Sequence, residues 1–320
     1  MNHEEIINKV HEALEAKQLN FTAKMAETFA LVNGVYVPTG TYTPIRDDKK
    51  GEDAIIKGNA FSEHYVPIQN EEAFSVLGEM ADLADVEFKN VGSWGNGAGI
   101  YAQVSLGEIT GIGSKDDRVG KYISLVNSHD GTRSLQLLVT PYRFFCQNQI
   151  SKALGDARRN NRLISIHHNI YGQDRLRELA EALKFAGDVF AETEIAYKRL
   201  ADKVITMDVV REVVYRSTLL PGFNLKQKTL EKKIQGMLDR FNYADNGELD
   251  KMTGWNLYNA VQGAFQHGVK KTATYERSLI LGGIAQQAEG SLNIVNNVLF
   301  EGGMKKTSTA EFDAIFDKVA

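Results

Sequence analysis

The sequence predicts an α+β fold: an N-terminal, mostly antiparallel sheet with flanking helices, followed by an all-helical C-terminal half. Two observations lead to this prediction. Short β-branched and aromatic runs, bounded by Gly, Asp or Asn, dominate residues 34–67 and 85–141. From about Ser151 onward, apolar residues recur at helical spacing instead. We therefore divide the 320 residues into an α+β domain over 1–170 and a helical domain or extension over 171–320.

Three segments of the N-terminal half have helical patterns. Ile7, Val10 and Leu14 fall on one face and predict a helix over residues 3–17. A second short helix is expected from Thr22 to about Val32, ending at the turn signal Asn33-Gly34. A third is expected over residues 71–84, again from apolar spacing.

Several segments of this half have the character of short strands. Between the second and third helices these are GVYVP, TYTPIRDD, AIIKGNA and HYVPIQN. Further strands are expected in EFKNVGSWGNGAGIYAQVSL (87–106) and as a central pair over 121–141. The Asp-Gly of His129-Asp130-Gly131, between the two central strands, supplies the positive φ that a tight turn needs.

The C-terminal half is expected to be helical throughout. Its clearest element is a helix from Asp174 to Ile205 with a heptad seam, formed by Leu176, Leu179, Leu183, Ala186, Phe190, Thr193, Tyr197, Leu200 and Val204. This seam is either a self-association surface or a face that packs within the chain's own helical domain. Further helices are predicted over 208–218, 224–241, 254–267, 274–299 and 309–319.

Composition excludes some classes of protein. Hydrophobic residues make up 43% of the chain and charged residues 24%, as in ordinary globular proteins. No apolar run approaches the roughly 18 residues that span a membrane, and we expect neither a membrane segment nor a signal peptide. One cysteine allows no internal disulfide and fits the cytoplasm. The net charge of −4 argues against a histone-like binder, but it leaves a local basic groove open.

One pair of adjacent motifs resembles a known family. SHDGTRS (128–134) followed by TPYRFFCQNQI (140–150) resembles the phage/plasmid-like family catalogued as a domain of unknown function, number 932. Matching blocks follow the same order, namely TYTPIRDD (41–48), YVPIQNEEAF (65–74), ISIHHN (164–169) and TGWNLYNAVQGAFQH (253–267). The resemblance implies a gene of phages, prophages or plasmids, a host-cytoplasmic location and, through neighbouring recombination genes, a role in DNA metabolism. It transfers no catalytic residue.

A basic and aromatic run suits a single nucleic-acid strand. Arg143 lies among Tyr142, Phe144 and Phe145. Downstream, Asp156 is the one acidic residue among four basic ones, Lys152, Arg158, Arg159 and Arg162. Cations neutralise phosphates, and aromatic rings stack on bases. The alternative is that the phenylalanines belong to the core and the arginines form a solvated face.

A glycine-rich stretch, GSWGNGAG (92–99), lacks the Lys-Ser/Thr of a phosphate-binding loop and the spacing of a dinucleotide fold. We expect a flexible hairpin with Trp94 exposed at its tip, where the ring is available to a base or a partner.

His129, Asp130 and Cys146 each allow a chemical interpretation. His129 with an acid such as Asp47 or Asp48 could perform acid–base or metal chemistry, whereas a simple turn explains the same residues. Cys146 could be a nucleophile with His129 or His167 as its base, or a packing residue. We assign no catalytic residue, metal or cofactor.

The leading hypothesis is a non-enzymatic, homo-oligomeric protein that binds single-stranded DNA and assists recombination or annealing, without a membrane. Its expected interface consists of Arg46, Trp94, Arg143, Lys152, Arg158, Arg159 and Arg162. The alternatives are a metal-dependent enzyme acting on nucleic acid or a nucleotide, and a protein-interaction factor that acts through its helical half.

Overall fold

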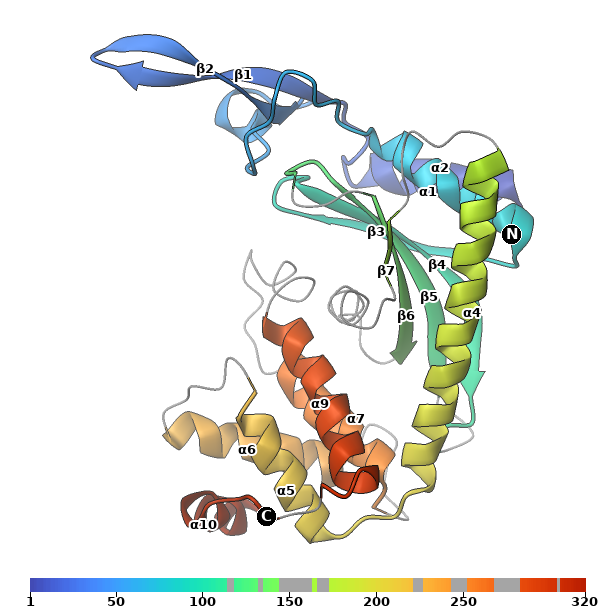
Figure 1. Ribbon diagram of the computed structural model, residues 1–320, viewed down its shortest axis with the longest axis vertical. Helices are drawn as coiled ribbons and strands as arrows, with labels where there is room; N and C mark the ends of the chain where they lie inside the picture. Colours follow the sequence, from blue (N-terminus) through green and yellow to red (C-terminus); the bar gives the residue numbers. More distant parts are fainter. Residues whose placement is uncertain are drawn as a thin grey trace. The chain divides into compact units, whose positions relative to one another are not determined.

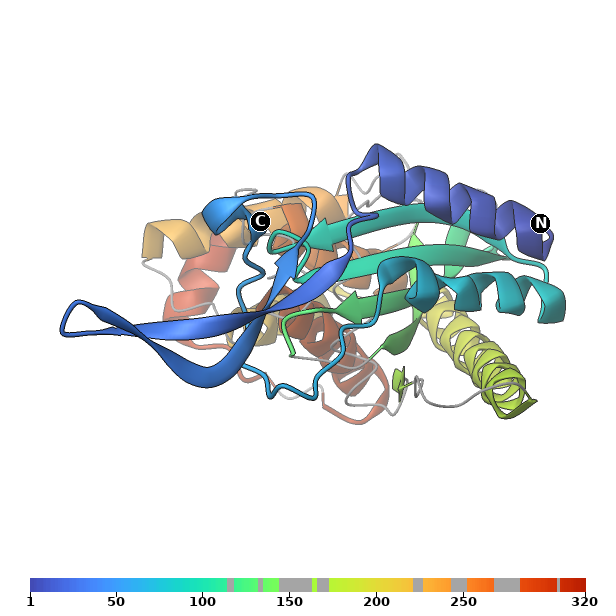
Figure 2. The ribbon, with the colours of Figure 1, turned by 90° about the horizontal axis from the view of Figure 1, so that it is seen from above.

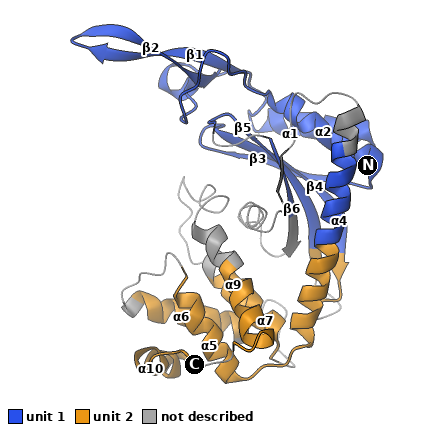
Figure 3. Ribbon diagram, in the orientation of Figure 1, with its two compact units in different colours: residues 1–108, 120–142, 157–189 blue, residues 109–119, 143–156, 190–320 orange. Residues whose placement is uncertain are grey.

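A computed structural model describes most of the chain (Figure 1), over residues 1–113, 118–131, 135–143, 163–165, 173–220, 227–242, 252–267, 283–303 and 306–320. The chain divides into two compact units (Figure 3). Unit 1 consists of residues 1–108, 120–142 and 157–189, and unit 2 consists of 109–119, 143–156 and 190–320. The expected domain boundary at 170/171 falls on residues outside the described ones, so it stays a prediction.

Unit 1 has two helices where the sequence predicts them, α1 (His3–Ala16) and α2 (Asn70–Leu83). Asn2 caps α1 in a capping box with Glu5, which satisfies backbone N–H groups that the first turn leaves unpaired. The buried stripe of α1 is Ile6, Val10 and Leu14, so the stripe begins one residue before the expected Ile7. α1 packs against α2 and the first strand of the main sheet.

The predicted helix from Thr22 to Val32 is wrong. This segment is strand β1 (Ala23–Val32), which pairs antiparallel with β2 (Val35–Arg46). Asn33 and Gly34 have φ angles of 50° and 82°, the two positive values that a type I′ hairpin turn requires. Alanine, lysine and glutamate give β1 helical propensity, but pairing with the β-branched and aromatic residues of β2 overrides it. The hairpin extends away from α1 and α2 (Figure 2).

The four expected short strands after Asn33 become one long strand and an irregular segment. GVYVP and TYTPIRDD lie together in β2. AIIKGNA and HYVPIQN form no regular strand, and this part of the prediction is wrong. A 3-10 turn, η1 (Gly51–Ala54), precedes two isolated bridges, Ile45 with Ile55 and Tyr42 with Phe61. The segment is therefore fastened to β2 at single points rather than along a ladder.

The main sheet has five strands, in the order β3-β4-β5-β6-β7. Their bounds are β3 (Glu87–Trp94), β4 (Gly99–Thr110), β5 (Arg118–Ser128), β6 (Gln136–Arg143) and β7 (Leu163–Ser165). β3 pairs antiparallel with β4, and β6 with β7. Helices α1 and α2 lie along one face of this sheet (Figures 1 and 2). The α+β class and its N-terminal antiparallel strands are thus confirmed.

The described elements after residue 172 are helices. They are α4 (Gln173–Asp202), α5 (Met207–Thr218), α6 (Gln227–Asn242), α7 (Gly254–His267), α9 (Gly283–Phe300) and α10 (Ala310–Val319). The expected all-helical C-terminal half is confirmed only in part, because strands β6 and β7 precede these helices. No helix in the described ranges has the length and apolarity to cross a membrane.

The core of unit 2 is built from helices and one connection between strands. Trp255, Tyr258 and Val261 are buried on α7, and Tyr197 of α4 packs on both rings. Ile109, Ile112 and Val119, around the β4–β5 connection, belong to the same core.

The heptad seam of α4 is largely internal. Six of its residues are buried, namely Leu179, Ala186, Phe190, Thr193, Tyr197 and Leu200. Val204 lies beyond the helix and is 61% exposed, so its predicted place in the seam is wrong. A seam that packs within the chain is thus the alternative that the burial pattern favours.

Candidate functional site

The His129-Asp130-Gly131 turn directly follows β5 and is held from two sides. The backbone N–H of His129 donates to the carbonyl of Ala98, at 2.8 Å, in the β3–β4 hairpin. Asn59 donates twice, from its backbone N–H to the Asp130 carbonyl at 2.9 Å and from its amide to the Gly131 carbonyl at 3.2 Å. Gly131 has a φ of 72°, the conformation that the Asp-Gly pair predicts. The turn is therefore a fixed part of unit 1.

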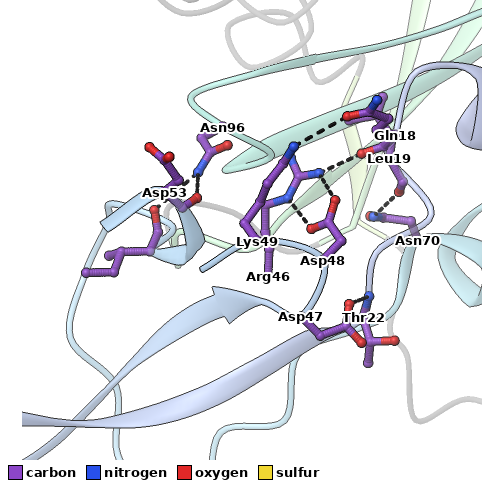
Figure 4. Close-up of polar contacts among 11 residues, drawn as sticks. Gln18, Leu19, Thr22, Arg46, Asp47, Asp48, Lys49, Asp53, Asn70 and Asn96 are labelled. Atoms are coloured by element: carbon purple, nitrogen blue, oxygen red, sulfur yellow. Dashed lines mark hydrogen bonds and ion pairs between the residues drawn. The ribbon is translucent and has the colours of Figure 1, made fainter. Parts of the chain in front are cut away.

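A buried amide orients the His129 ring. The Asn70 Nδ2 group donates to the Leu19 carbonyl at 2.9 Å, which leaves the Asn70 Oδ1 atom as an acceptor (Figure 4). That oxygen accepts from Asn127 Nδ2 at 3.1 Å and lies 3.0 Å from His129 Nε2. His129 Nε2 must therefore carry the proton. The predicted pairing of His129 with Asp47 or Asp48 is replaced by this amide contact.

His129 is a neutral, buried imidazole. Only 1% of His129 is exposed. Burial lowers its pKa to about 4, and the nearby Asp130 raises the pKa by a smaller amount. The Nδ1 atom then holds a lone pair, and it makes no hydrogen bond with any residue in the described ranges. An unprotonated ring nitrogen in a buried polar cluster can accept a hydrogen bond or a proton.

Asp130 lies beside the segment of residues 58–65, which packs against the turn. Ser128 Oγ donates to Asp130 Oδ1 at 2.6 Å. Burial, and secondarily the Asp130 charge, raises the pKa of Tyr65, whose ring stacks on Phe61 with 3.9 Å between centroids. A Cβ on Gly58 would lie 2.5 Å from the Asp130 Cβ, so only glycine allows this approach.

Arg46 is buried in a closed ion pair, not presented as a surface cation. Its Nε and Nη2 atoms donate to the two Asp48 oxygens at 2.9 and 2.7 Å, and Nη2 also donates to the Gln18 carbonyl at 2.6 Å (Figure 4). The hydrogen bond from Arg46 is the largest cause that lowers the pKa of Asp48. Only 5% of Arg46 is exposed, which leaves it little room to contact a phosphate.

Phe21 connects this ion pair to the histidine cluster. The Arg46 guanidinium carbon lies 4.1 Å from the centroid of the Phe21 ring. The Phe21 ring is also tilted against His129, with 5.6 Å between centroids. Residues of three motifs, TYTPIRDD, YVPIQNEEAF and SHDGTRS, thereby meet in one region of unit 1. We call this region the motif cluster. It is formed by six buried residues, Phe21, Arg46, Asn70, Asn127, His129 and Asp130, and by Asp48, which is exposed.

The predicted exposure of Trp94 is wrong. Trp94 is the last residue of β3 and only 6% of it is exposed. Its ring occupies the space above Gly99, the residue opposite in the hairpin, where a Cβ would lie 1.9 Å from the ring. The glycine-rich turn thus makes room for the indole. Asn96 anchors the turn by donating to the Asp53 carbonyl at 2.7 Å (Figure 4).

The other expected interface residues lie outside the described side chains. The backbone of Arg143 ends β6, but its side chain is not among those described. Lys152, Arg158, Arg159 and Arg162 fall in the range 144–162, outside the described residues, as does Cys146. His167 lies outside them too.

The expected acidic residues do not assemble into a metal site. Asp47 accepts from the Thr22 backbone N–H at 2.8 Å (Figure 4), and Asp48 is bound to Arg46. Over the residues that the structure describes, no group of three or more His, Cys, Asp or Glu side chains is placed to hold a metal ion. The polar groups of the motif cluster are instead the Arg46–Asp48 pair, two amides, a neutral imidazole and the carboxyl group of Asp130, which accepts from Ser128.

Sequence reasoning singled out four members of the cluster but missed three. The four are Arg46, Asp48, His129 and Asp130. Asn70 carried a usable signal, because it stands in the motif YVPIQNEEAF. Phe21 and Asn127 carried none, since nothing in their local sequence separates them from ordinary core and strand residues.

Replacing Gly58 tests how closely the turn is covered. Gly58→Ala places a methyl group against the Asp130 backbone, and we expect a loss of about 1–3 kcal/mol in the free energy of unfolding. Chemical denaturation measures the loss. The control is Gly187→Ala on α4, where a Cβ meets nothing within 4 Å, so it should leave stability unchanged or slightly raised. Equal stability of the Gly58→Ala variant and the wild type would contradict the close approach.

The buried imidazole predicts a specific pH dependence. In the unfolded chain His129 has the ordinary histidine pKa of 6.5, but in the folded chain its pKa is lowered to about 4. Between these values the unfolded state binds more protons, so the free energy of unfolding rises with pH, by about 3 kcal/mol in total from this residue. The contribution should be absent from His129→Gln, so that the two stability–pH curves differ in slope between pH 4 and 6.5.

The matched control for this experiment is His64→Gln, since the His64 side chain is 86% exposed. Urea denaturation from pH 4 to 8 provides the curves. A His64→Gln curve that parallels the wild type, together with a flatter His129→Gln curve, is the expected result. Identical slopes for all three proteins would show that His129 is not a buried neutral group.

Comparison with known proteins gives a family and no closer relative. No curated protein and no solved structure matches the chain. The model of one family, described as a domain of unknown function, matches residues 59–292. This range includes Asn70, Asn127 and the His129-Asp130-Gly131 turn, and it covers more than half of the chain. The chain therefore belongs to the family described as Domain of unknown function (DUF932).

Proposed function

We propose that this protein binds single-stranded nucleic acid and assists recombination or annealing of DNA in a mobile genetic element. The observation that supports the proposal is the charge of the sequence that connects β6 and β7. Five basic residues and one acidic residue occupy positions 143–162, in a chain whose net charge is −4. In the sequence, this run begins at the last residue of β6 and ends at the residue before β7.

The two ends of the run are fastened to neighbouring strands. β6 and β7 are antiparallel, with Leu138 opposite Leu163 and Gln136 opposite Ser165. β7 stands last in the order of strands. The segment that connects these two strands has a local excess of positive charge in its sequence, and such an excess attracts phosphates even when the whole chain is acidic.

Two of the expected interface residues, Arg46 and Trp94, are buried in unit 1 and are not available for direct contacts. Arg46 is bound to Asp48 and Trp94 is buried, so the proposed interface consists of Arg143, Lys152, Arg158, Arg159 and Arg162. Tyr142, Phe144 and Phe145 add rings beside the first of these cations. Base stacking on such rings is tolerant of sequence, which suits a protein that acts on any single strand.

Removing three of these cations should weaken binding and its salt dependence together. For Arg158→Ala/Arg159→Ala/Arg162→Ala we expect roughly tenfold or greater loss of affinity for a labelled single strand at low salt. The slope of log affinity against log salt should fall in magnitude by about 2, because single strands release roughly 0.7 counterion per neutralised phosphate. Fluorescence anisotropy at several salt concentrations measures both quantities.

The matched control is Lys198→Ala/Lys232→Ala/Lys318→Ala. It removes three exposed lysines of unit 2, one each on α4, α6 and α10. It changes the net charge equally, so its affinity and slope should stay close to wild type. Duplex DNA of the same sequence tests the preference for single strands. Absence of salt-sensitive binding by the wild type, or an equal loss in the two triple variants, would refute the proposal.

A further inference from the structure

The tip of the β1–β2 hairpin is an exposed, uncharged and apolar surface. We call residues 29–40 the hairpin arm, and none of them is charged. Every residue of the arm is exposed. Its large apolar side chains have the following exposed fractions: Phe29 51%, Leu31 64%, Val32 49%, Val35 62%, Tyr36 73% and Val37 44%.

Both faces of the arm carry apolar side chains. Cross-strand partners share a face, so Phe29 with Pro38 and Leu31 with Tyr36 form one face. Ala30 with Val37 and Val32 with Val35 form the other face. An ordinary antiparallel sheet has one apolar and one polar face, because only one faces a core. The arm therefore has the apolar character of strands that are buried on both faces.

The exposed apolar surface of the arm is large for a monomer. An aromatic side chain has about 150–250 Å² and an aliphatic one has less, so the six residues expose roughly 600 Å². This is the upper end of the range of about 300–600 Å² for the largest apolar patch on a typical monomer. A stable protein–protein interface needs about 800 Å² from each partner, and the arm supplies most of that area. A two-stranded hairpin alone in water is also only marginally stable.

The chemistry of the arm selects a protein as its partner. A nucleic acid would need cations along the arm, and it has none. A lipid bilayer would need every backbone group satisfied within the chain. In the described residues, β1 and β2 form a sheet of two strands. Other described segments pair with this sheet only through two isolated bridges, at Tyr42 and Ile45, near the base of the hairpin. The arm therefore presents backbone groups that an added strand can pair with.

We propose that the hairpin arm is a self-association element, covered in solution by a second copy of this chain. Two copies with a net charge of −4 repel one another, and an uncharged contact surface avoids that repulsion at the interface. Two arms are also complementary to each other, since each supplies the open outer edge of β1 and apolar faces of the same kind. This inference concerns assembly without nucleic acid, so it stands or falls independently of the proposed function.

Sedimentation velocity of the full chain, without nucleic acid and over a range of micromolar concentrations, tests the proposal. We expect the wild type to form dimers or larger assemblies. The variant Leu31→Thr/Val32→Thr/Val35→Thr/Tyr36→Thr removes apolar area from both faces but retains residues that favour strands. It should sediment as a monomer at concentrations where the wild type assembles. A monomeric wild type, or a variant that assembles as the wild type does, would overturn the proposal.

The matched control replaces four exposed apolar residues elsewhere, Val66, Ile195, Val204 and Leu219, whose exposed fractions are 61–78%. The variant Val66→Thr/Ile195→Thr/Val204→Thr/Leu219→Thr removes a similar area and should assemble as the wild type does. If it dissociates equally, apolar area in general, rather than the arm, drives association, and the proposal fails.

A second measurement does not depend on how the threonine variant folds. In a Cys146→Ser background, Val35→Cys labelled with a benzophenone maleimide should cross-link to a second copy of the chain on illumination. The same label at Val66→Cys is the control and should give far less dimer. Absence of cross-linked dimer at Val35→Cys would count against the proposal. So would flotation of the wild type as a monomer with neutral phosphatidylcholine vesicles, since lipid would then be the occupant.

Discussion

The amide of Asn70 is the contact on which the arrangement of unit 1 depends. It stands at the first residue of α2, donates to the segment that follows α1, and accepts from β5 and from the turn after β5. A buried amide has strict donor and acceptor directions, so each of these partners has one allowed position. Replacing the amide would leave several buried polar groups unsatisfied, at about 1–3 kcal/mol for each.

This polar network also explains how a cation can stand in the interior of an acidic chain. Asp48 lies beside the buried Arg46 and compensates its charge, and the guanidinium carbon lies 4.1 Å from the centroid of the Phe21 ring. The same ring is tilted against His129, whose neutral form is favoured by burial. The cluster thus holds one compensated ion pair and one uncharged base at close quarters, and its order derives from satisfied hydrogen bonds rather than net charge.

Elements with strong local patterns could be predicted from the sequence, and those set by distant partners could not. The amphipathic stripes of α1 and α4 are local, and both helices are where the sequence predicts them. Residues 23–32 have helical propensity, yet pairing with β2 makes them a strand. Trp94 is buried because Gly99 has no side chain, a relation visible only once the hairpin register is known. His129 and Asn70 are 59 positions apart, so no spacing rule could join them.

The prolines of β2 decide in which direction an open sheet can grow. Pro38 and Pro44 have no backbone N–H to donate. The Pro44 carbonyl accepts from Ile56 on the edge of β2 that faces away from β1. Val35 pairs with Val32 across the two-residue turn and so points toward β1, which turns Pro38, three positions later, to the edge that faces away from β1. That edge is a poor template for a further strand, whereas the outer edge of β1 carries no proline. In the proposed self-association, strand addition would therefore be restricted to one side, which favours assemblies of finite size over endless fibres.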